Sequence, residues 1–173
     1  MTDVVPAGPV SLPIYLLRRM VAKSATFRAA VGVSTTAEAL AHIYVKEVDD
    51  TERRPCAVIC TEGTRYQAIA GGSQVQLRAD GEVFLYLTMD TPEAYFNDPT
   101  NAFLHFANFY GGVMDDVAAL SGADQTEDST FPDSDLSITG IRDLPCMECP
   151  REMWASLGRY WLGAWVISWG DGG

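Results

Sequence analysis

The sequence has no lysine or arginine between residues 79 and 141, and it lacks an apolar run of the ~18 residues that a membrane-spanning helix needs. Its start, MTDVVPAGPVSLP, has no basic segment followed by an apolar one, so we expect no secretory signal. Four cysteines without such a signal indicate a reducing compartment and free thiols. The net charge of -11 argues against a general nucleic-acid binder, because phosphate contacts need clustered Lys and Arg.

The acidic residues are concentrated in the middle of the chain. Residues 79–141 hold twelve Asp and Glu, whereas residues 1–78 hold nine Lys and Arg beside seven acids. Two interpretations remain open. The block forms a solvated acidic face with an acidic loop, or it forms a surface that repels nucleic acid or meets a basic partner.

A hydrophobic fraction of 47% over 173 residues predicts one domain with a real core. Residues 1–10 are rich in Pro and Gly and read as an extended arm, which leaves residues 11–173 as a single domain. Apolar spacing predicts a helix over 11–31 that stops at Gly32, a short helix from Ser34, and a long helix over 100–121. Ser34 is a capable cap without a capping box, because Ala37 stands three residues later. Gly111-Gly112 interrupts the long helix and suggests a kink or a close contact.

Alternating or continuous apolar runs predict the strands. They cover residues 42–48, 55–61, 81–90, 136–144 and 159–170, with weaker strands on either side of Gly71-Gly72. The mostly apolar run PCAVICT at 55–61 is expected to be central in its sheet. The fold class is therefore α+β, with an antiparallel or mixed sheet packed by an N-terminal helix and a long middle helix. Residues 122–135 read as an acidic loop, and PCMECPRE, bounded by prolines, is expected to be irregular.

The cysteines form two pairs. Cys56 and Cys60 stand four residues apart in a predicted strand, so they lie ~13 Å apart, too far to share one zinc ion or form a disulfide. Cys146 and Cys149 have the CxxC spacing of a zinc or redox site, but the histidines His42 and His105 lack metal-motif spacing. A thiol or zinc protein built on this pair stays an alternative, and the expectation for the chain is no metal and no cofactor.

Motifs for catalysis are missing from the sequence. It has no GxSxG elbow, and the glycines of IAGGSQ have no Lys or helix pattern behind them, so neither nucleophilic catalysis nor phosphate binding is indicated. Asp49-Asp50 and Asp115-Asp116 are sequence neighbours whose spacing carries no catalytic specificity. We therefore expect a protein that is not an enzyme.

The last predicted strand alternates, which places three tryptophans on one face. That face is either ordinary core or a subunit interface, where Trp often anchors contacts. The candidate interface residues combine this face with two charged pairs; they are Trp161, Trp165, Trp169, Arg18, Arg19, Asp115 and Asp116.

The order of elements resembles the small tail-terminator and tail-completion proteins of long-tailed phages and gene-transfer particles. The resemblance covers about two thirds of the chain. It lies in a helix that ends in FRAAVG, the strand IYV, the strand RPCAVI, the strand GEVFLYL, and a closing aromatic strand before Gly170. The matching residues are Phe27, Arg28, Gly32, Ile43, Tyr44, Arg54, Pro55, Ala57, Val58, Ile59, Trp169 and Gly170. The loop at 122–135 and PCMECP have no counterpart in that pattern.

The resemblance implies a structural virion protein that is made in the host cytoplasm and ends up in the tail or neck of the particle. It would form a ring, typically a homohexamer, that caps the tail tube and joins it to a neck or head-completion protein. DNA would pass through the lumen without specific binding, and no membrane would be involved. From the residues alone, another class stays open, a small acidic inhibitor or immunity-type protein that binds a basic partner.

Overall fold

The computed structural model describes residues 10–45, 53–71, 74–121 and 136–171 of the chain. Residues 1–9 of the predicted N-terminal arm (1–10) and the predicted acidic loop 122–135 lie outside these residues. In chain order the elements are α1 (Ser11–Lys23), α2 (Ala25–Val31), α3 (Thr36–Ala39), η1 (Leu40–His42), β1 (Ile43–Val45), β2 (Cys56–Gly71), β3 (Gln74–Asp90), η2 (Glu93–Tyr95), α4 (Pro99–Ser121), β4 (Leu136–Asp143), β5 (Met147–Glu148), η4 (Arg151–Met153), α5 (Trp154–Leu157) and β6 (Tyr160–Asp171).

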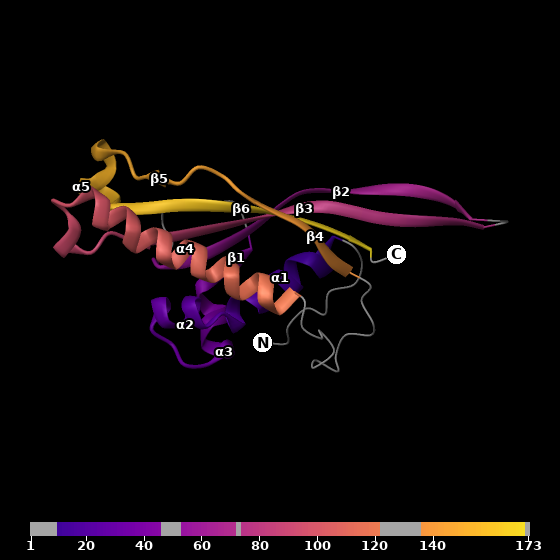
Figure 1. Ribbon diagram of the computed structural model, residues 1–173, viewed down its shortest axis with the longest axis horizontal. Helices are drawn as coiled ribbons and strands as arrows, with labels where there is room; N and C mark the ends of the chain where they lie inside the picture. Colours follow the sequence, from indigo (N-terminus) through magenta and orange to yellow (C-terminus); the bar gives the residue numbers. More distant parts are fainter. Residues whose placement is uncertain (1–9, 46–52, 72–73, 122–135, 172–173) are drawn as a thin grey trace.

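Six strands form one mixed sheet in the order β1-β2-β3-β6-β4, and β5 also pairs with β6. The pairing of β1 with β2 is parallel, and the remaining pairings are antiparallel. Helices α1, α2 and α4 lie on one side of the sheet (Figure 1). The α+β class is therefore confirmed, and of the two sheet types considered the mixed one is correct.

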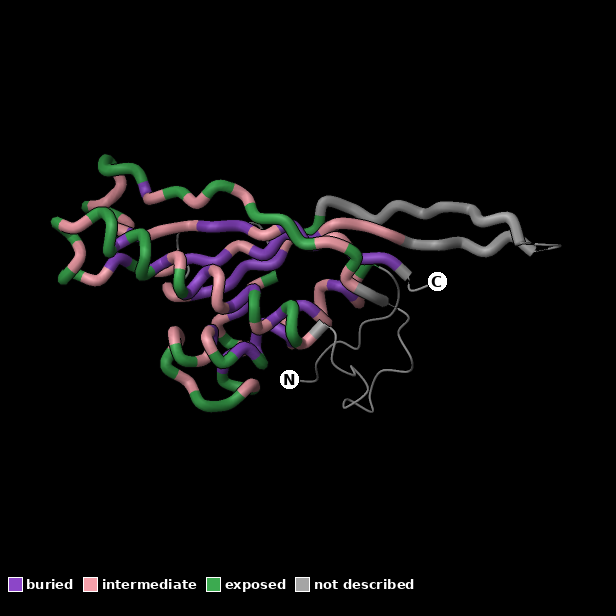
Figure 2. Tube along the Cα trace, in the orientation of Figure 1, coloured by how far each residue is buried: buried purple, intermediate pink, exposed green. Residues whose placement is uncertain are grey.

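The core lies between the sheet and these helices, as the buried residues in Figure 2 show. Alternate residues of β3, such as Val83, Leu85 and Leu87, point into it, as expected from the two-residue period of a strand. From the helices it receives Leu17 and Phe27, together with the buried face of α4.

The predicted helix over 11–31 is in fact two helices that meet at Ser24. This residue adopts φ -56° and ψ 125°, which is not helical, and its side chain accepts a hydrogen bond from the backbone N–H of Phe27. A serine hydroxyl competes for backbone donors in this way, which makes serine a good N-cap. The predicted stop at Gly32 is confirmed, because Gly32 ends α2 in the left-handed conformation with φ 73°.

The predicted short helix is capped one residue later than expected, and it does have a capping box. The cap of α3 is Thr35, whose side chain accepts from the Glu38 N–H while the Glu38 carboxylate accepts from the Thr35 N–H. The Thr35 hydroxyl also donates to the Glu38 carboxylate at 2.8 Å, and this hydrogen bond, followed by those from the backbone N–H groups of Thr35 and Ser34, lowers the pKa of Glu38 below its ordinary value.

The strand predictions hold, with one extension. PCAVICT lies in β2, between β1 and β3, so its interior position is confirmed. The weak strands around Gly71-Gly72 continue β2 and β3 into a long hairpin. Of the strand predicted over 42–48, Ile43–Val45 is a strand, and residues 46–48 lie outside the described part.

The long helix is confirmed as α4, and its glycine pair does make a close contact. A methyl group on Gly112 would lie 2.9 Å from Cγ2 of Thr26 in α2, whereas one on Gly111 would meet nothing within 4 Å. Helical spacing of the apolar residues predicts that Phe103 faces the core, but Phe103 is 41% exposed and Phe109 is buried instead. PCMECPRE is also more regular than expected, because it contributes β5 and the turn η4.

Candidate interaction surface

The tryptophan face of β6 is covered by helix α4 of the same chain. The Trp161 ring lies 5.2 Å from Phe103 and 6.1 Å from Phe106 between centroids, and Trp165 stacks on Tyr110 at 4.7 Å. Trp169 is 4% exposed. The indole N–H groups of Trp161 and Trp165 are buried and have no acceptor among the described residues. The arrangement favours the core interpretation of this face over a subunit contact.

Gly163 makes this packing possible. It stands between Trp161 and Trp165 on the side of β6 that faces α4, and the Tyr110 ring fills the space above it. The Tyr110 hydroxyl donates a 2.7 Å hydrogen bond to the Ala164 carbonyl. Burial raises the pKa of Tyr110 well above its ordinary value, and the neighbouring Cys146 and Asp143 add to the shift. Tyr110 is therefore a neutral hydrogen-bond donor at any physiological pH.

Three of the four charged candidate residues have partners within the chain. Arg18 donates to the Leu40 carbonyl at 3.2 Å, and Arg19 donates to the Tyr15 hydroxyl at 2.7 Å. Asp116 accepts from the Ser24 hydroxyl at 2.7 Å and from the Thr26 N–H at 3.0 Å, so it binds the start of α2 to α4. Asp115 is exposed on α4.

The cysteines do not converge on one site. Cys56 and Cys60 lie in the extended strand β2, and the Cys56 Sγ is 3.1 Å from the Thr88 hydroxyl. Cys146 and Cys149 flank β5 without a disulfide bond between them. Burial and the nearby Asp143 carboxylate raise the pKa of Cys146, which disfavours its reactive thiolate form. Among the described residues no group of three or more His, Cys, Asp or Glu is placed to hold a metal ion.

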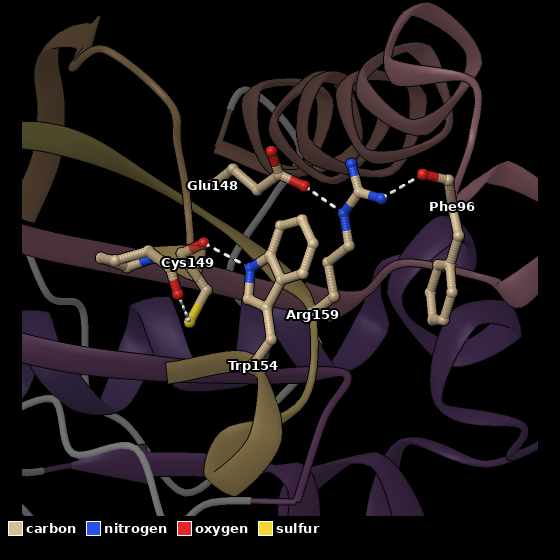
Figure 3. A network of polar contacts seen from close by, with 6 residues as sticks. Phe96, Glu148, Cys149, Trp154 and Arg159 are labelled. Atoms are coloured by element: carbon tan, nitrogen blue, oxygen red, sulfur yellow. Dashed lines mark hydrogen bonds and ion pairs between the residues drawn. The ribbon is translucent and has the colours of Figure 1, made fainter. Parts of the chain in front are cut away.

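An arginine clamp, which the sequence did not indicate, holds the short helix α5 against the start of β6 (Figure 3). The guanidinium of Arg159 pairs with Glu148, donates to the Phe96 carbonyl, and lies 4.5 Å from the Trp154 ring. Trp154 in turn donates from Nε1 to the Cys149 carbonyl at 2.8 Å. The planar guanidinium can form hydrogen bonds and stack at the same time, so this cluster joins four chain segments.

A second arginine, Arg54, also joins several chain segments at the start of β6. Arg54 lies 4.1 Å from the centroid of the Tyr160 ring, pairs with Asp90 at 2.6 Å, and donates to the Leu157 carbonyl. Both arginines are satisfied by neighbours in the chain. They stabilise this end of the molecule.

The far end of the β2–β3 hairpin leaves the sheet. β6 pairs with β3 only from Asp80 to Asp90, whereas β2 and β3 stay paired out to Gly71↔Gln74. Residues 66–71 and 74–79, here called the projecting hairpin, are thus two-stranded, with no third strand beside them in the part of the chain that is described (Figure 1). A two-stranded ribbon on its own is only marginally stable in water.

At the opposite end of the molecule, apolar residues are exposed around η2 and the first turns of α4. Phe96 and Leu104 are 43% and 48% exposed, and the half-exposed Phe103 lies beside them in sequence. Scattered exposed apolar residues are ordinary, but these three fall within nine positions of the sequence. We call these three residues the apolar patch.

Searches relate this chain to no protein family and to no curated protein. No described helix is long and apolar enough to cross a membrane. The candidate surfaces therefore rest on the geometry of the chain itself. They are the projecting hairpin and the apolar patch, at opposite ends of the long axis (Figure 1).

Proposed function

We propose that this protein is a structural subunit of a phage-like particle, a tail terminator that assembles into a ring on the tail tube. The observation that carries the proposal is the projecting hairpin. A ribbon that extends beyond its own sheet gains little stability alone and suits a contact with another subunit. The order of elements, which resembles tail-terminator and tail-completion proteins, supports the same function.

In this proposal the subunits form a closed ring, a hexamer in the family that the sequence resembles. One face of the ring contacts the tail-tube protein and stops its polymerisation, and the other receives the neck or head-completion protein. The acidic residues of the middle segment suit a channel for DNA, since Glu93 and Asp115 are exposed and like charges keep DNA from binding to the wall. The assembled protein resides in the virion.

The test is the mass of the purified protein in solution, combined with electron-microscope class averages. We expect closed rings, and we expect addition of the protein to polymerising tail-tube subunits to limit tube length. A protein that stays monomeric alone and in the presence of tail tubes would contradict the proposal. Co-purification with a basic toxin or nuclease instead of virion proteins would favour the acidic-inhibitor alternative.

A further inference from the structure

We draw no further inference here: the strongest candidate, the apolar patch of Phe96, Phe103 and Leu104 around η2 and the first turns of α4, carries none because nothing in the structure shows what covers it.

Discussion

Replacing Gly163 with alanine should destabilise the protein, although alanine is usually the better residue in a strand. The new methyl carbon would lie 2.6 Å and 2.8 Å from two carbons of the Tyr110 ring and 3.1 Å from the Cys146 Sγ. Carbon atoms in contact prefer about 3.5–4.0 Å, so the ring must move by roughly 1 Å. The ring is not free to do so, because it stacks on Trp165 and its hydroxyl is bonded to the Ala164 carbonyl.

The size of the effect follows from these opposing terms. Overpacking a core by one methyl group costs about 1–3 kcal/mol, and weakening the hydroxyl bond adds about 1 kcal/mol. In the opposite direction, replacing a glycine in a strand by alanine stabilises the folded state by about 0.5–1 kcal/mol, because the unfolded chain has less conformational entropy to lose. We expect Gly163→Ala to lower the free energy of unfolding by about 2 kcal/mol, and the melting temperature by roughly 4–8 °C for a domain of this size.

The assay is urea denaturation followed by tryptophan fluorescence, because Trp161 and Trp165 flank the substituted position. The near-ultraviolet circular dichroism of the folded protein should change as well, since the stacking of Tyr110 on Trp165 is disturbed. An unfolding midpoint equal to or above that of the wild-type protein would refute the reasoning. It would mean that α4 can move away from β6 at little cost.

Three further predictions concern the helices and the arginine clamp. Gly111→Ala should raise the free energy of unfolding by about 1 kcal/mol, while Gly112→Ala should give no gain or a loss, because its methyl group meets a threonine of α2; equal effects in thermal melts would contradict the close contact. Burial opposes the ionisation of Asp116, but its hydrogen bonds to the start of α2 outweigh burial and lower its pKa, so Asp116→Asn should cost about 1–2 kcal/mol at neutral pH. That cost should shrink in acid melts as the pH falls through the lowered pKa, where wild-type Asp116 also becomes neutral, and a cost independent of pH would argue against it. Arg159→Ala should cost about 2 kcal/mol in urea denaturation, whereas Arg151→Ala, on an exposed residue, should change stability by less than about 0.5 kcal/mol.

Local patterns predicted the elements of this fold well. The alternating residues of β3 and β6 and the repeating apolar residues of α4 are strong periodic signals, and each gave the correct element. The break at Ser24 was missed because apolar residues continue on both sides of it in helical spacing. The helix breaks there because the Ser24 side chain caps α2, and its hydroxyl also donates to Asp116, 92 residues away. Sequence spacing cannot show a partner at that distance.

The candidate surfaces were harder to predict than the elements. The tryptophans of β6 stood out by type, but only the placement of α4 shows that they lie against the chain's own helix. The projecting hairpin was visible as two weak strands around Gly71-Gly72. That it lacks a third strand depends on where β6 stops, which is a property of tertiary structure. Phe103 has the spacing of the buried face, yet in the first turns of α4 it is 41% exposed.

The position of β6 in the sheet has a consequence for how the chain folds as it is synthesised. This strand is the last of the described strands to leave the ribosome, yet it lies between β3 and β4 and also pairs with β5. Until residues 160–171 emerge, the β3 edge from Asp80 to Asp90 and the whole of β4 lack their partner, and α4 lacks the aromatic surface on which it rests. Unpaired strand edges are prone to join other chains. The described sheet is therefore complete only once residues 160–171 have been made, and a nascent chain that lacks β6 should aggregate.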